Sequence, residues 1–167
     1  MNNRLIFKLF FIFLFLCQGC GYTPRAYFLP PHIKHLYIDT FENKTDQPNV
    51  ELDLRKELVS TFQNDGNLDI TSSEQADAVL DGAIVDYSRQ ALRYKDDEAV
   101  WEYRLKITVN FEFADLTKNN IIVKENDFAG ETTFYLSGSM AKTENVARKE
   151  AITDLCRRIL NKVITLW

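Results

Sequence analysis

Few side chains of this chain could take part in covalent or metal chemistry, since its 167 residues include three cysteines and two histidines. Cys17 and Cys20 lie near the N-terminus, and Cys156 lies near the other end. A cysteine thiol can act as a nucleophile, as a metal ligand or as an acceptor of a lipid group. The neighbours of each cysteine and histidine therefore decide which of these reactions it could support.

The two histidines predict no metal site and no catalytic site. His32 and His35 are three residues apart at the start of an expected strand, so their side chains point to opposite faces. No cluster of cysteines or carboxylates accompanies them to complete a set of ligands. The sequence also lacks a Gly-x-Ser-x-Gly motif and a glycine-rich phosphate loop. We expect no metal, no cofactor and no enzyme, because a catalytic triad would have to be built from one of these two histidines.

The first sixteen residues are typical of a secretory signal peptide. Arg4 and Lys8 are followed by an unbroken apolar run from Leu9 to Leu16, with no acidic residue. That run is too short to cross a bilayer as a helix, which needs about 20 residues. The segment is therefore predicted to direct export and not to span the membrane.

Cys20 is the predicted site of lipid attachment. A bacterial lipoprotein signal places a small residue before the modified cysteine, and Gly19 precedes Cys20. Cys17 fits less well because the bulky Leu16 precedes it. Gly21 follows Cys20 where an aspartate would favour retention, so the expected destination is the outer membrane. The predicted organisation is a lipoprotein signal peptide over residues 1–19, a lipidated tether over 20–31 and one domain over 32–167.

The charge and the last cysteine limit the possible partners of the domain. The whole chain has a formal net charge of −4, and cleavage of the signal would remove two basic residues and no acidic one. An acidic domain lacks the general electrostatic character of a nucleic-acid binder. Cys156 would be left as a free thiol, and it is expected to be a small buried residue.

One stretch, from Trp101 to Phe113, indicates how the domain is built. Its odd positions are apolar and its even positions are polar or charged, which is the period of a β-strand. One face must be covered by apolar side chains, and the other must meet water or a polar partner. We take Glu102, Arg104 and Lys106 as candidates for the partner-facing side of this strand.

The remaining elements follow from periodicity and from turn residues. Strand, helix and strand in succession over residues 33–71 predict a parallel crossover. Gly66 is expected to end that helix, a cap for it is expected from Thr45 or Asp46, and Gly130 is expected to mark a bulge. The predicted strands span residues 33–41, 68–71, 78–94, 101–113 and 121–136, and the predicted helices span 49–64 and 143–167.

These elements predict an α+β fold. Two amphipathic helices would pack on one face of a four- or five-stranded mixed sheet, which is largely antiparallel, and would form a two-layer domain. The other face of the long strands would stay uncovered. A sheet with one wet face is common and by itself implies no function.

Several short motifs, taken in order, resemble the family of lipopolysaccharide-assembly lipoproteins called LptE. The similarity covers nearly the whole chain, and the order and spacing of the motifs are more specific than any one motif. The motifs are Gly19-Cys20-Gly21-Tyr22, Phe41-Glu42-Asn43-Lys44-Thr45, Ala76-Asp77-Ala78-Val79-Leu80-Asp81-Gly82, Glu102-Tyr103-Arg104-Leu105, Ser137-Gly138 and a last helix ending at Trp167.

The resemblance implies a lipoprotein on the periplasmic side of the outer membrane, anchored in the membrane by its N-terminal lipid. Such proteins plug the lumen of the β-barrel protein LptD, assist its folding and help to pass lipopolysaccharide to the cell surface. Basic residues at one end of the sheet are the expected contacts to lipopolysaccharide, since phosphorylated sugars attract arginine and lysine. The candidates here are Arg89, Arg93, Lys95 and Arg104. The alternative is that they form a solvated strand end, offset by the acidic residues 96–98.

A different envelope module remains an alternative. The first strand, its turn, the helix and the Ala-Asp motif also resemble the group of CsgG, LpoB and the N-terminal domain of TolB. Those proteins act in secretion or envelope assembly without lipopolysaccharide. A constitutive β-barrel partner would separate the two hypotheses, because only the LptE-like role requires one.

The prediction for Cys20 can be tested by substitution. Cys20→Ser should leave an unprocessed, unacylated precursor, because serine has no thiol to accept the diacylglyceryl group. Cys17→Ser is the matched control and should be processed normally. Metabolic labelling with a radioactive fatty acid and the mobility of the protein on a gel would measure both effects. Normal processing of Cys20→Ser would show that the anchor lies elsewhere.

Overall fold

The computed structural model describes residues 29–94 and 99–165. The predicted signal peptide, Cys17, Cys20, most of the tether, Lys95 and Trp167 lie outside the described residues. Of the residues the structure describes, none belongs to a helix long and apolar enough to cross a membrane.

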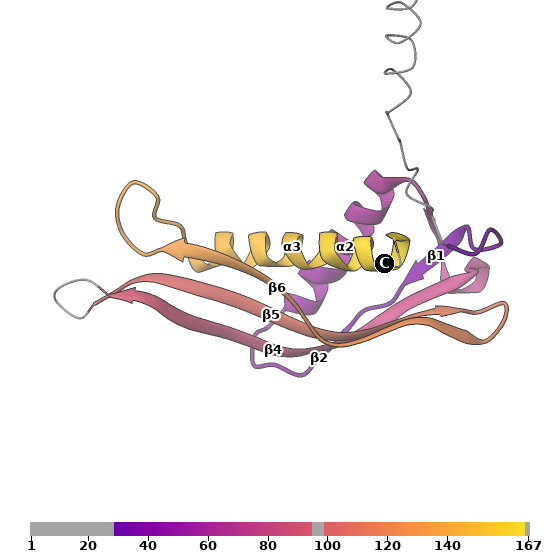
Figure 1. The fold of residues 1–167 in the computed structure, drawn as a ribbon, viewed down its shortest axis with the longest axis horizontal. Helices are drawn as coiled ribbons and strands as arrows, with labels where there is room; N and C mark the ends of the chain where they lie inside the picture. Colours follow the sequence, from indigo (N-terminus) through magenta and orange to yellow (C-terminus); the bar gives the residue numbers. More distant parts are fainter. Residues whose placement is uncertain (1–28, 95–98, 166–167) are drawn as a thin grey trace, which may run out of the picture.

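The described chain forms an α+β fold in which two helices pack on a mixed sheet (Figure 1). The sheet has six strands in the order β3-β1-β4-β5-β6, and β2 pairs with β4 beside this path. In chain order the elements are β1 (His35–Ile38), β2 (Glu42–Asn43), α2 (Val50–Asp65), β3 (Asp69–Ile70), the short 3₁₀ helix η1 (Ser73–Gln75), β4 (Ala78–Tyr94), β5 (Val100–Asp115), β6 (Asn120–Tyr135) and α3 (Glu144–Thr165).

Strands β4, β5 and β6 form a long antiparallel meander with β5 in its centre. The predicted alternation is confirmed in the middle of β5, where Leu105 and Ile107 are fully buried and Lys106 between them is exposed. It is less complete elsewhere, because Glu102 and Thr108 on the polar side are also buried. Each of these strands has 16 or 17 residues. At about 3.3 Å per residue the meander is therefore about 53 Å long.

The predicted parallel crossover is also confirmed. Strand β1 pairs in parallel with β3 and with β4, and α2 connects β1 and β2 to β3. The sheet has more strands than the four or five expected. The extra strand is β2, because Glu42 and Asn43, which lie between the predicted strand 33–41 and the predicted helix 49–64, pair with Ala83 and Ile84 of β4.

Helix α2 is held by an apolar row at four-residue spacing. Its four buried residues are Val50, Leu54, Leu58 and Phe62. Gly66 ends the helix at φ 73°, as expected for a left-handed cap. The cap predicted at the start is wrong, because Asn49 occupies that position at φ 63° and makes no capping hydrogen bond through its side chain.

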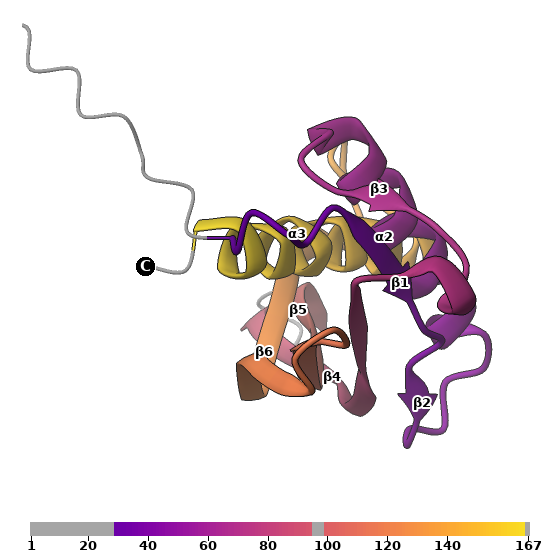
Figure 2. The same cartoon turned by 90° about the vertical axis from the view of Figure 1, so that its right-hand side faces the viewer.

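Helix α3 lies along β5 and β6, with α2 beside it nearer to β1 (Figure 2). One row of its buried residues has one member per turn, and the first two are alanines, whose small side chains let the helix approach the sheet closely. The row consists of Ala147, Ala151, Leu155, Ile159 and Val163. Cys156 is also buried, as predicted, and burial raises the pKa of its thiol.

Gly130 allows this close approach and does not mark a bulge. A Cβ atom at this position would lie 2.5 Å from the Cβ of Leu155 and 2.6 Å from the carbonyl oxygen of Ala151. The register is regular there, with Gly130 opposite Ile107. The two register shifts of β6 lie earlier, and the one between the partners of Val109 and Phe111 contains Asp127 at φ 54°.

The contact at Gly130 predicts a destabilising substitution. Gly130→Ala should lower the free energy of unfolding by about 1–3 kcal/mol, because the methyl group would push α3 away from β6. Urea denaturation followed by circular dichroism would measure the change. Thr133→Ala, at an exposed position of the same strand, is the control and should change stability by less than about 0.5 kcal/mol. Equal stability of the two variants would mean that the helix does not press on this glycine.

Candidate functional site

The face of the meander that points away from α3 carries the candidate partner-facing residues. Because side chains alternate along β5, Glu102, Arg104 and Lys106 project from the side opposite Leu105 and Ile107. Neighbouring strands add side chains from positions directly across in the register. We call this surface the polar face, and it consists of Asp86, Ser88, Gln90, Glu102, Arg104, Lys106, Glu131 and Thr133.

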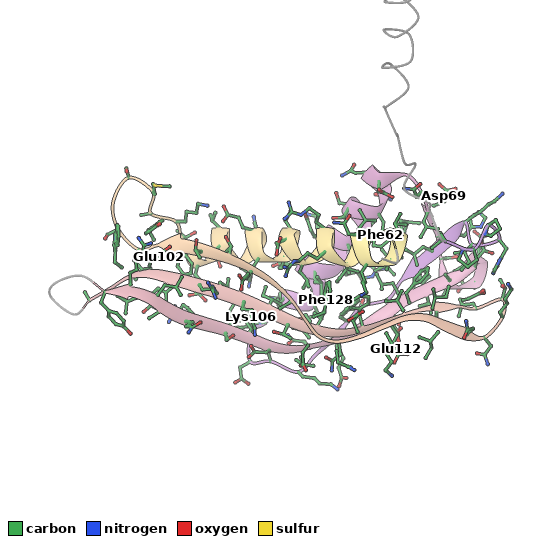
Figure 3. All side chains as sticks on the ribbon, viewed as in Figure 1. Phe62, Asp69, Glu102, Lys106, Glu112 and Phe128 are labelled. Atoms are coloured by element: carbon green, nitrogen blue, oxygen red, sulfur yellow. The ribbon has the colours of Figure 1, made fainter. Side chains whose placement is uncertain are left out.

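The charges of the polar face are only partly paired. Arg93 Nε lies 3.1 Å from Glu102 Oε2, and Glu102 is buried beneath this contact. The distance from Arg104 Nε to Glu131 Oε2 is longer, at 3.8 Å. Lys106, labelled in Figure 3, is exposed, and among the described carboxylates none lies within ion-pair distance of its ammonium group. The face therefore presents an unpaired cation among hydroxyl, amide and acidic groups.

The structure separates the basic residues that were grouped as candidates for lipopolysaccharide. Arg93 and Arg104 contact carboxylates of the polar face. Arg89 lies on the other side of the sheet, where its Nη1 donates to Glu144 Oε2 of α3 at 2.7 Å. Its guanidinium carbon also lies 4.9 Å from the centre of the Tyr103 ring. Lys95 lies outside the described residues, so the structure brings together two of the four.

A register shift in β4 explains why Arg89 faces α3. The pairing with β5 slips between Ile84 and Asp86, so one extra residue enters β4 and inverts the alternation beyond it. After the shift, Tyr87 lies opposite Ile107 and Arg89 lies opposite Leu105. The residues around the shift are valine, aspartate and isoleucine, with no glycine or proline to signal a bulge. Sequence reasoning therefore had no sign of the inversion.

Both histidines bind aspartates where the N-terminal segment joins the sheet. His32 Nε2 lies 2.6 Å from Asp115 Oδ2 at the end of β5. Asp77 Oδ2, just before β4, accepts hydrogen bonds from the backbone N–H groups of Lys34 and His35 at 3.0 and 2.9 Å. The ring of His35 contacts the same oxygen. The histidines thus fasten the incoming chain, and the described residues contain no group of three or more possible metal ligands.

Asp115 is the most perturbed carboxylate of this junction. Hydrogen bonds from the Thr117 hydroxyl above all, and also from His32 and from the backbone N–H groups of Thr117 and Lys118, hold its pKa well below the ordinary value. Its side chain is 3% exposed, so these contacts replace water almost completely. The junction of tether and sheet is therefore a specific hydrogen-bonded contact.

The opposite end of the meander exposes apolar and aromatic side chains. Tyr94 at the end of β4, Leu136 after β6 and Met140 in the following loop are 63%, 52% and 69% exposed. Near them the rings of Trp101 and Tyr135 pack with their centres 5.1 Å apart. We call this the free end, because the tether joins the sheet at the other end (Figure 1).

Solved structures of three bacterial proteins are similar to this chain in fold. Lipoprotein B from Nitrosomonas europaea aligns with a TM-score of 0.55 at 16% identity, over 87% of this chain and 92% of its own. PelC, a dodecamer from Paraburkholderia phytofirmans, aligns with 0.53 at 18% identity, over 83% and 95%. A minor lipoprotein from Acinetobacter baumannii aligns with 0.52 at 22% identity, over 80% and 92%. Curated proteins gave no significant match.

The fold is thus that of a class of small α+β domains. Two of the three similar structures named above are described as lipoproteins. Within this class, the family model LptE, described as lipopolysaccharide-assembly, matches residues 33–163. The chain therefore belongs to the LptE family. The match begins in the segment that holds the two histidines and ends in α3, so it covers the whole sheet.

The low pKa of Asp115 predicts how stability depends on pH. A carboxylate whose pKa is lowered by folding contributes stability that is complete above about pH 4 and is lost as the pH falls toward its folded-state pKa. Asp115→Asn should therefore lower the urea midpoint at pH 7, and the difference from the unmodified protein should shrink between about pH 4 and pH 2.

Asp81 provides the control of opposite sign. Burial, Glu112 and Asp39 raise the pKa of Asp81, so Asp81→Asn should leave the midpoint at pH 7 unchanged or raise it. A deficit of Asp115→Asn that stays constant over the whole pH range would show that the charge of Asp115 contributes nothing.

Proposed function

We propose that this protein is an outer-membrane lipoprotein that plugs an LptD-type β-barrel and assists its assembly during the transport of lipopolysaccharide to the cell surface. Its lipid is carried by Cys20, on the periplasmic side, and its role is not enzymatic. The observation that carries the proposal is the match of residues 33–163 to the lipopolysaccharide-assembly family. The length of the meander and the chemistry of its polar face support it.

The length of the meander suits a barrel lumen. Outer-membrane barrels have an apolar band about 25 Å tall, and three strands of about 53 Å exceed it. A protein held at the periplasmic leaflet by its tether could therefore pass through the whole height of the lumen. The tether end would remain on the periplasmic side and the free end would reach the outer side.

The chemistry of the polar face also suits a lumen. The interior of an outer-membrane barrel is polar and wet, so a partner surface made of hydroxyl, amide and charged groups meets it without burying unpaired apolar surface. Lys106 and the weakly paired Arg104 are the cations on this face that a carboxylate of the barrel would bind. Glu102 is less available, because it is buried beneath Arg93.

Arg93 and Arg104 are the proposed contacts to lipopolysaccharide. Arg104 belongs to the polar face and Arg93 contacts Glu102 of that face, and guanidinium groups bind phosphates in a bidentate manner. Lys95, two residues after Arg93 in the chain, belongs to the same proposal. Arg89 is a weaker candidate, since it lies on the side of the sheet that faces α3 and is paired there with Glu144.

A second function is an envelope-assembly or secretion module with no role in lipopolysaccharide transport. The observation in its favour is that the fold is shared with PelC, which forms a dodecamer. The two functions differ in their partner. Purification of the tagged, full-length protein from its own outer membrane in mild detergent, followed by mass spectrometry, would identify that partner. A near-stoichiometric large β-barrel protein supports the LptE-like role, whereas recovery without a barrel supports the second function.

The polar face itself can be tested with charge reversals. Arg104→Glu with Lys106→Glu should reduce the barrel recovered with the protein by about tenfold or more, because two attractive contacts become repulsive. The matched control is Lys56→Glu with Lys149→Glu, which makes the same change of charge at exposed positions of α2 and α3. Unchanged recovery with the first pair, in a protein that still folds, would place the interface elsewhere.

A further inference from the structure

The hairpin of β5 and β6 exposes two apolar side chains beside the point where the tether joins the sheet, Leu116 in the turn and Ile121 at the start of β6. Leu116 is 48% exposed and Ile121 is 49% exposed. Isolated exposed apolar residues are ordinary on protein surfaces. These two, however, lie at one tip of the meander, at the end that a lipid on the tether would hold near a membrane (Figure 1).

The contacts of the tether bring it directly to this turn. His32 binds Asp115, the residue before Leu116, and the backbone N–H of Leu116 donates to the carbonyl oxygen of Asp77 at 2.8 Å. Asp77 in turn binds Lys34 and His35. The start of the described chain, the start of β4 and the β5–β6 turn are therefore tied together as one end of the molecule.

We propose that this tether end docks on the surface of a phospholipid bilayer, with Leu116 and Ile121 entering the interfacial layer. The inference rests on the proposed lipid at Cys20 and concerns the protein before it enters a barrel, because inside a lumen this end would point into the periplasm. Nine residues, 20–28, lie between the lipid and the described chain, and fully extended they span at most about 32 Å. A lipidated protein therefore keeps this end within that distance of the leaflet, where even a weak apolar contact is favoured by the high local concentration.

The charges at the tether end are compatible with a lipid surface. Asp77 and Asp115, its carboxylates nearest the turn, are engaged by histidines and by backbone N–H groups. Lys34 and Lys118 are exposed there and can approach anionic headgroups. The exposed Asp69 belongs to β3, on the other side of β1 from the meander (Figure 3). The turn itself thus offers the apolar Leu116 and the cationic Lys118, and the carboxylate that adjoins it, Asp115, is already bound.

Site-specific fluorescence would test the docking. The processed, lipidated protein carrying Leu116→Cys is labelled with the environment-sensitive dye NBD and reconstituted into vesicles of phosphatidylethanolamine and phosphatidylglycerol. Leu136→Cys is the matched control, because it is a leucine of similar exposure at the free end. Cys156 does not interfere, since it is fully buried and its thiol pKa is raised.

The expected result is that brominated acyl chains quench the dye at position 116 by about twofold or more and leave the dye at position 136 unchanged. The dye at 116 should also emit at shorter wavelength than the dye at 136. Equal emission and equal quenching at the two positions would overturn the docking and leave the proposed barrel interaction untouched. Failure of the protein to float with the vesicles would overturn both the lipid anchor and the docking, which is a different outcome from the loss of a barrel partner.

Discussion

The close packing of α3 against β5 and β6 is the contact on which the rest of the structure depends. It is possible because Gly130 has no side chain where Leu155 and Ala151 approach, and because α3 presents alanines in its first turns. This packing buries the apolar side of β5 and so determines which side of the meander stays open. Interiors of proteins are close-packed, so a larger side chain at such a contact would force the helix and the sheet apart.

The packing of α3 on one side of the meander leaves the other side uncovered and leaves the two ends of the meander accessible. One side of β5 packs against α3. Because side chains alternate along β5, Arg104 and Lys106 then project from the polar face. The two ends differ because the tether is fastened at one of them by His32 and Asp115, while the other exposes Tyr94 and Met140. The proposed roles in a barrel lumen and at a lipid surface use these differences between faces and between ends.

Two groups of charged residues differ in their role: one holds α3 on the sheet, and the other can bind a partner. Arg89, Glu144 and Tyr87 meet between the sheet and the start of α3, and they help to hold the helix there. Arg104 and Lys106 lie two positions apart on the other side of the sheet. Arg104 has one long ion pair, to Glu131, and Lys106 has none among the described residues. Exposed ion pairs contribute at most about 1 kcal/mol, so such cations can exchange partners at low cost.

The sequence by itself determined the long strands, the two helices, the left-handed cap at Gly66 and the family, because periodicity and local motifs record burial on one face of each element. Only the tertiary structure decided the strand order, the pairing of β2 and the role of Gly130, since these depend on which segments meet. It also separated Arg89 from Arg104, although both are basic residues of neighbouring long strands. The register shift after Ile84 inverts the alternation of side chains along β4. This shift arises from the pairing of β4 with β5, and no residue type in β4 predicts it.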